Sequence, residues 1–310
     1  MHDVSLEVDT KPKMEDDINH RGGRMRNLRD LADKPSYSEI NREERNLCAI
    51  LFHLLHINDN MRKFMTLLKP IPPFGDSEEV TGVYVEYAYA RDLWDHMRGK
   101  EANEKKRSFV TEKLGLDDLG RFAETSMSTE DFNKTFVAGT KISKIHIQNP
   151  GRWSVDKIKE AFIKDADGIF LSACTFKWAF NVKPDLVIHL DGNKAVCIEA
   201  KLESYEDQYP GDKGEKRIFE ERFKDSWLGN RMSQTKVQRY LMEDILGLTS
   251  HPVFLRKSRQ NKVEQDNDKL PQELTWPEVF NGLDRGGIPN YMEQAVESAI
   301  KNSERRGRGK

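Results

Sequence analysis

Residues 183–203, KPDLVIHLDGNKAVCIEAKLE, predict two β-strands joined by a tight turn. Large apolar residues occupy every second position in both halves, and a period of two is typical of a strand with two different faces. The intervening residues 191–194, DGNK, can form the turn because Gly and Asn tolerate positive φ. In the second half Glu199, Lys201 and Glu203 fall on one face, and the other face is wholly apolar. We expect the apolar face to pack against a core.

Two carboxylates on neighbouring strands can bind a hard divalent cation. Asp185 on the first strand and Glu199 on the second can converge on Mg²⁺, which prefers oxygen ligands and keeps several waters. Lys201 points to the same side as Glu199, where its ammonium can contact an attacking water or the charge that develops on a phosphate. The pattern therefore indicates metal-assisted chemistry on a phosphate group.

The length of the turn decides whether Asp185 and Glu199 can meet. In a regular antiparallel hairpin, paired residues project to the same face and their numbers have a constant sum. A two-residue turn at Gly192-Asn193 would pair Asp185 with Ala200 and place Asp185 on the face opposite Glu199. We therefore predict an odd-numbered loop, or a bulge between Asp185 and the turn. Three residues with Gly192 or Asn193 at positive φ are the most economical solution.

The pair Pro184-Asp185, followed after thirteen intervening residues by Glu199-Ala200-Lys201, resembles the PD-(D/E)xK signature of restriction-endonuclease-like nucleases. The resemblance implies that Asp185, Glu199 and the backbone carbonyl of Ala200 hold Mg²⁺, for which Mn²⁺ can substitute. It also implies that Lys201 orients the attacking water or stabilises the transition state. The expected activity is metal-dependent hydrolysis of phosphodiester bonds, by a DNA endonuclease of the restriction or phage-defence type.

Two other classes of protein stay open. A catalytically silent protein with a nuclease-like fold would bind nucleic acid or assemble with partners. In a protein unrelated to nucleases the hairpin would be fortuitous, since solvated strand faces often carry charges. Glu-x-Lys alone means little, because Glu104-Lys105-Lys106 also matches it inside a polar run. The conjunction of the chain's single Pro-Asp pair with Glu-x-Lys on a second strand favours the nuclease.

A helix before the sheet is expected within residues 38–57, SEINREERNLCAILFHLLHI. In the family that the hairpin resembles, such a helix often lends a further carboxylate to the metal site. Glu44 is the candidate for that role here, with Glu43 close behind. Acidic residues also stabilise the first turn of any helix, so this electrostatic role explains Glu44 equally well.

A helix after the hairpin is expected at residues 233–247 and carries Gln234 and Gln238, four residues apart. Some members of the family have a Gln-x-x-x-Tyr motif on the corresponding helix. The spacing to Tyr240 departs from that motif, so the resemblance implies only a general polar role, for which Gln238 is favoured.

The predicted fold class is α/β (α+β), with a restriction-endonuclease-like core in which helices flank a central mixed β-sheet. The core order is helix, three strands, helix and strand. The first of the three strands is expected within 168–182, where aromatic residues recur at period two, and the last strand at 251–257. Other expected elements are a strand at 141–148, a helix at 154–168 ended by Gly168, a polar connection at 204–230 and a helix starting near Trp276. The expected regions are a flexible arm (1–36), an added, mostly helical N-terminal region that contributes the first core helix (37–150), the nuclease core (151–300) and a basic tail (301–310).

Composition limits the partners and the compartment. The 310 residues carry a net charge of −2, with 37% hydrophobic and 33% charged residues, so any nucleic acid must be bound by local patches. Cys48, Cys174 and Cys197 are widely spaced and form no disulfide pattern, which favours a reducing compartment. No apolar window approaches the ~20 residues that span a membrane. We expect a cytoplasmic protein that binds DNA in preference to RNA and no membrane, and that can form a homodimer.

Overall fold

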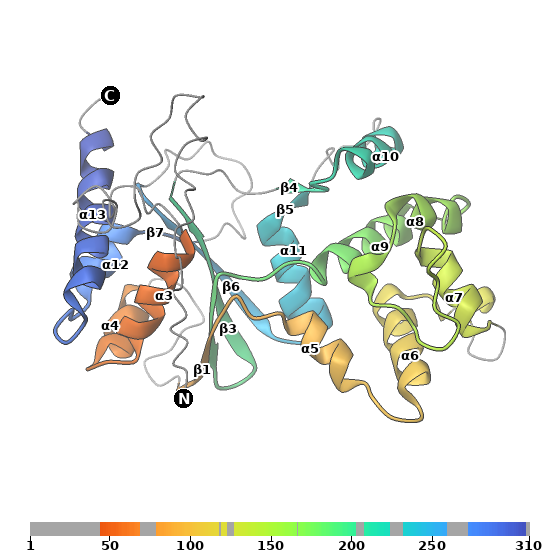
Figure 1. Cartoon of the computed structure of the whole chain (residues 1–310), viewed down its shortest axis with the longest axis horizontal. Coiled ribbons are helices and arrows are strands. Elements are labelled where there is room, and N and C mark those ends of the chain that lie inside the picture. The colour runs from red at the N-terminus through yellow and green to blue at the C-terminus, as the bar shows by residue number, and fades with distance from the viewer. Residues whose placement is uncertain are drawn as a thin grey trace, which may run out of the picture. The chain divides into compact units, whose positions relative to one another are not determined.

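A mixed β-sheet lies at the centre of the computed structural model (Figure 1). Among the described residues it has five strands, in the order β1 (Val80–Val85), β2 (Leu186–Leu190), β3 (Lys194–Lys201), β6 (Thr249–Arg256) and β7 (Gln272–Thr275). Strands β1, β2 and β3 pair antiparallel, whereas β6 and β7 continue the sheet parallel to β3. The predicted α/β class, with a central mixed sheet flanked by helices, is confirmed.

The structure describes residues 44–68, 79–117, 119–122, 127–165, 167–202, 208–223, 232–258 and 272–307. All of them belong to one unit, Arg42–Lys310. The predicted arm at 1–36, Glu43 and Glu203 lie outside the described residues. Within those described ranges, no helix has the length and apolar character to cross a bilayer.

The β2–β3 hairpin has the loop that the chemistry requires. Its register runs from Leu190 paired with Lys194 to Leu186 paired with Ile198, which leaves residues 191–193 as a three-residue loop. Gly192 and Asn193 have φ values of 66° and 58°. The predicted odd loop with positive φ is therefore confirmed, and continuing the register by one residue sets Asp185 opposite Glu199.

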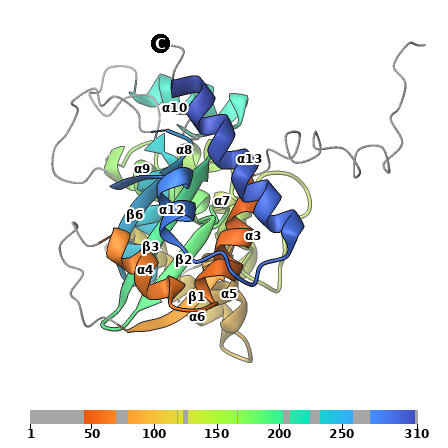
Figure 2. The same ribbon diagram turned by 90° about the vertical axis from the view of Figure 1, so that its left-hand side faces the viewer.

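Helices bury both faces of the hairpin (Figures 1 and 2). On one face, the apolar side chains of Leu186, Ile188, Val196, Ile198 and Ala200 join a core with four helices. These helices are α3 (Glu44–Leu55), α4 (Asn60–Leu67), α12 (Trp276–Gly282) and α13 (Asn290–Gly307). The predicted core-facing apolar surface is confirmed.

The second face of the sheet packs on the longer run of helices. Val187, Ala195 and Cys197 lie in this core. The helices are α5 (Tyr89–His96), α6 (Ala102–Leu114), α7 (Thr129–Phe136), α8 (Val155–Ala161), α9 (Asp167–Ala179), α10 (Lys213–Phe223) and α11 (Gln234–Tyr240), the last continuing as a π-helical turn at Leu241–Ile245. Short elements are the 3₁₀ turns η1 (Gly120–Phe122) and η2 (Pro150–Arg152) and the strands β4 (Gln208–Tyr209) and β5 (Met232–Ser233). Glu199 and Lys201 face this side, because Cys197 precedes them at period two.

The first strand of the antiparallel meander was predicted wrongly. Residues 168–182 form most of helix α9 and its end, and the first strand is β1, which pairs with β2. Phe176, Trp178 and Phe180 are all buried. A helix buried on most sides carries apolar residues at many spacings, so a period of two arises there without a strand. The helical region at 37–150 thus gives the sheet a strand as well as helix α3.

The strand predicted at 141–148 is also absent from the structure, which describes this whole stretch as a loop. The side chain of Asn133 on α7 donates to the carbonyls of Ser143 and His146, each at 2.8 Å. These bonds satisfy the loop backbone where a neighbouring strand would otherwise be needed.

Three further predictions need correction, because the structure places or ends helices differently there. Helix α8 ends at Ala161, and Gly168 lies inside the next helix, α9. The connection predicted at 204–230 contains helix α10, which buries Ile218, Phe219 and Phe223 despite its many charges. Helix α13 runs to Gly307, so residues 301–307 of the predicted tail are helical and residues 308–310 lie outside the described part.

Candidate functional site

Asp185 lies just before β2 and its carboxylate reaches across to β3. The backbone N–H of Ala200 donates to Oδ2 of Asp185 at 2.8 Å. Burial, followed by repulsion from Glu199, raises the pKa of Asp185 from 3.8 to about 7, against the lowering effects of the Ala200 N–H and of Lys201. The ionised carboxylate is therefore costly here, and a bound cation would relieve that cost.

Glu199, on β3, is almost fully buried, and both of its carboxylate oxygens have partners. Oε1 is 2.9 Å from Nζ of Lys201, which is also buried. Oε2 accepts a hydrogen bond from Nε2 of Gln238 at 2.5 Å. Helix α11 therefore positions Gln238 to fix the orientation of Glu199, while Lys201 balances its charge.

Glu44 is the first described residue of α3 and lies at the end of β3. Its Oε1 accepts a hydrogen bond from the backbone N–H of Leu202 at 2.8 Å. The charge of Glu44 is also one of the influences that raise the pKa of Asp185. Helix α3, which was predicted to lend a carboxylate, therefore places Glu44 at the end of β3.

The pKa of the Cys48 thiol responds to the same carboxylates. This thiol is buried on α3, one turn after Glu44. Burial raises its pKa most, and the charges of Asp185, Glu199 and Glu44 raise it further. The charges of these carboxylates therefore act on the same end of α3, an influence that the sequence alone did not indicate.

The sequence-predicted side chains thus meet in one place. Direct contacts or the hairpin register join Asp185, Glu199, Ala200, Lys201 and Gln238, and Glu44 lies at the same end of β3 through the N–H of Leu202. Their functional roles stay predictions, because contacts alone do not assign them.

The donor set fits a hard cation with few protein ligands. No group of three or more His, Cys, Asp or Glu side chains suited to a metal was found among the described residues. Mg²⁺ does not need such a group, since it commonly takes one or two carboxylates and keeps several waters. Asp185 and Glu199 are two such carboxylates, and the electrostatic cost of ionising Asp185 would favour a cation beside it. The carbonyl of Ala200 as a third ligand is what the resemblance implies.

No family model, curated protein or solved structure matches this chain. The interpretation of the site therefore depends on its own residues and their geometry.

Two further polar residues adjoin the candidate site. Arg256 on β6 pairs in register with Lys201, is buried, and has its Nε 3.4 Å from Oε1 of Glu273. Gln234 lies one turn before Gln238, and its buried Oε1 has no hydrogen-bond partner in the described part of the chain. Residues 251–257 were predicted as a strand, but only the parallel register with β3 places Arg256 beside Lys201.

The variant Glu44→Gln separates two roles of this residue. The amide oxygen can still accept the N–H of Leu202, so we expect little change in the free energy of unfolding. Loss of the negative charge should lower metal-dependent activity by about 10-fold or more if Glu44 supports a cation, the range seen for groups that support metal ligands. Thermal unfolding and initial cleavage rates measure the two effects.

The matched control is Glu86→Gln, which removes a nearby carboxylate that is paired with Arg45 at 2.7 Å. Equal activity of Glu44→Gln and the wild type would return Glu44 to a purely structural role at the start of α3.

Proposed function

We propose that the chain is a metal-dependent nuclease of the PD-(D/E)xK type that hydrolyses phosphodiester bonds, with DNA as its substrate. The observation that carries the proposal is the hairpin register. It sets Asp185 opposite Glu199, and Lys201 and Gln238 both contact Glu199. A purely structural hairpin would not require Asp185 to lie opposite a carboxylate that already contacts both a lysine and a glutamine.

The order of elements around the site supports the proposal. Helix α3 is followed by the antiparallel strands β1, β2 and β3, then by helix α11 and the parallel strand β6. This is the sequence of elements expected of a restriction-endonuclease-like core. Here helices α5 to α9 are inserted between its first and second strands. A restriction or phage-defence role stays a prediction of the resemblance.

Each site residue has a defined task in this mechanism. A Mg²⁺ ion held by Asp185, Glu199 and the carbonyl of Ala200 would lower the pKa of a bound water and neutralise phosphate charge. Lys201 holds an ammonium beside the same carboxylate, where it can orient the attacking water or bind a phosphate oxygen. Gln238 keeps Glu199 in one rotamer through its hydrogen bond.

Metal dependence is the direct test. With supercoiled plasmid as substrate, we expect nicking or linearisation with Mg²⁺ or Mn²⁺, none with excess EDTA and little with Ca²⁺, which binds oxygen ligands with less fixed geometry. Agarose gels over a time course measure the rates. Full activity in EDTA would refute the proposal, and DNA binding without cleavage in any metal would favour the catalytically silent alternative.

A further inference from the structure

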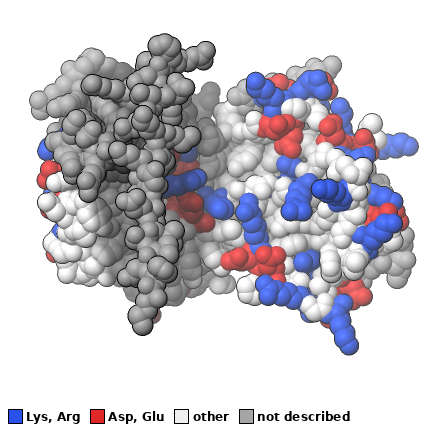
Figure 3. All heavy atoms as spheres, viewed as in Figure 1, with Lys and Arg blue, Asp and Glu red and all other residues white. Residues whose placement is uncertain are grey.

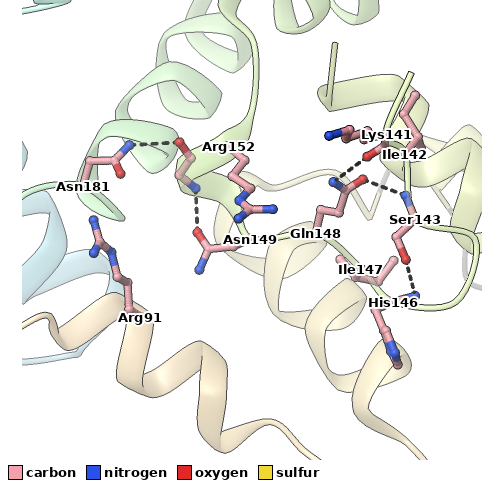
Figure 4. A pocket seen from close by; sticks show the side chains of 11 residues that line it. Arg91, Lys141, Ile142, Ser143, His146, Ile147, Gln148, Asn149, Arg152 and Asn181 are labelled. Carbon is pink, nitrogen blue, oxygen red and sulfur yellow. Dashed lines mark hydrogen bonds between the residues drawn. The ribbon is translucent and has the colours of Figure 1, made fainter. Parts of the chain in front are cut away.

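A pocket of about 720 Å³ lies in the helical insertion, lined by none of the residues of the candidate nuclease site. Its walls come from α5, from the loop at 141–149, from η2 and from Asn181, two residues after the end of α9 (Figure 4). Volumes of this size are typical of sites for small molecules. The pocket therefore offers space for a ligand that the nuclease proposal does not use.

The charged groups that line the pocket are cationic. Arg91, Lys141 and Arg152 line it together with His146, and its lining contains no Asp or Glu. In the described part of the chain none of these three Lys and Arg side chains has an ion pair, whereas many surface Lys and Arg side chains elsewhere do. Three uncompensated cations around one cavity raise the local concentration of anions.

The two arginines are suited to bind a phosphate. Nε of Arg91 donates to the carbonyl of Phe180 at 3.2 Å, which anchors the guanidinium. Figure 4 shows the guanidinium groups of Arg91 and Arg152 near Asn149, with the ring of His146 turned away from them. Guanidinium groups bind phosphate oxygens in a fork geometry, so the anchored guanidinium of Arg91 would orient a phosphate and Arg152 would add a second set of donors.

One wall of the pocket is polar, and hydrogen bonds between its own residues hold it in place. Gln148 accepts from the N–H of Ser143 at 3.1 Å, and Asn149 accepts from the N–H of Gly151 at 2.8 Å. Asn181 donates to the carbonyl of Gly151 at 3.1 Å. A Cβ at Gly151 would lie 2.9 Å from Oδ1 of Asn181, so a larger residue there would displace this amide side chain. The wall is preformed, which lowers the entropic cost of binding.

The distribution of charge favours a small ligand over a long polyanion. In the face of the molecule that Figure 3 draws, the coloured half has Lys and Arg side chains interspersed with acidic ones, without a continuous basic stripe. The whole chain carries a net charge of −2. A long nucleic-acid duplex is held by basic surface that follows its backbone, whereas a small ligand needs only a local group of cations.

We propose that this pocket binds a small organic phosphate of nucleotide size, with the phosphates on Arg91 and Arg152 and with Lys141 as a further cation of the lining. The neighbouring amide side chains of Gln148, Asn149 and Asn181 offer hydrogen bonds to the polar part of such a ligand. The proposal does not depend on nuclease activity.

Binding of a nucleoside diphosphate and of inorganic pyrophosphate tests the proposal. Isothermal titration calorimetry with the full chain in EDTA excludes binding through a divalent metal at the candidate nuclease site. We expect saturable 1:1 binding, weakened about 10-fold or more by Arg152→Gln and again by adding Arg91→Gln, because each removes a charge-assisted contact. Binding to Lys201→Ala should equal binding to the wild type.

The matched control is Arg217→Gln, which removes an exposed arginine on α10. The side chain of Arg152 has no hydrogen bond in the described structure, so its substitution tests binding without endangering the fold. The proposal is overturned if neither phosphate probe binds, or if Arg152→Gln and Arg217→Gln bind equally. It is also overturned if a short duplex, but no small phosphate, shows binding that depends on these arginines.

Discussion

Lys201→Met is expected to lower plasmid cleavage by at least about 100-fold while Mg²⁺ binding persists. The ammonium of Lys201 is buried and lies 2.9 Å from Glu199, one of the proposed ligands. Loss of one group that stabilises transition-state charge typically costs 10²–10³ in rate. Met preserves most of the packing volume, so the variant removes the charge and little else. Initial cleavage rates and Mn²⁺ titration measure the two effects.

The same variant should change the stability of the chain in a metal-dependent way. Without Lys201, Glu199 is a buried carboxylate that has lost its ion pair, a change that costs about 3–5 kcal/mol in other proteins. A divalent cation beside Glu199 would recover part of that cost. We therefore expect thermal unfolding of Lys201→Met to shift more on addition of Mg²⁺ than unfolding of the wild type.

A second buried lysine supplies the control. Lys177 on α9 is 2.8 Å from Glu215 and is as deeply buried as Lys201, but it lies outside the candidate site. Lys177→Met should lose comparable stability, cleave at the wild-type rate once folded and show no added response to Mg²⁺. Cleavage by Lys201→Met at the wild-type rate would make Lys201 a structural residue.

The hairpin was predictable because its information is local. Asp185 and Glu199 are fourteen positions apart, and the alternation of residue types defines both strands without help from the rest of the chain. The chemistry added a constraint that periodicity lacks, since Asp185 can lie opposite Glu199 only with an odd loop or with a bulge between Asp185 and the turn. The three-residue loop of the structure satisfies this constraint, because its register sets the two predicted site carboxylates opposite each other.

The parts of the fold and of the site that the sequence did not predict depend on contacts between distant segments of the chain. Strand β1 pairs with β2 across about a hundred residues of intervening chain, and its own six residues do not indicate their partner. Helix α9 is apolar on most sides, so its periodicity cannot separate a buried helix from a strand. Arg256 became a neighbour of Lys201 only through the parallel pairing of β6 with β3.

Asp185→Asn should abolish metal-dependent cleavage and, in the absence of metal, make the chain more stable at pH 8. Burial and Glu199 raise the pKa of Asp185 from 3.8 to about 7 in the folded state. The folded chain therefore holds this proton more tightly than the unfolded chain. Its contribution to stability is full below pH 4 and is lost as the pH rises through 7. Asn stays neutral and can still accept the N–H of Ala200.

Urea unfolding at pH 4 and pH 8, in EDTA and in Mg²⁺, measures this change. One pKa unit corresponds to about 1.4 kcal/mol, so the gain for Asp185→Asn in EDTA at pH 8 is on the order of 2–4 kcal/mol and vanishes near pH 4. Asp59→Asn is the control, since Arg62 lowers the pKa of this exposed carboxylate and the sign is opposite. Saturating Mg²⁺ should stabilise the wild type but not Asp185→Asn, because only the wild type offers the carboxylate. Equal stabilisation of both chains by Mg²⁺ would place the cation elsewhere and remove Asp185 from the metal site.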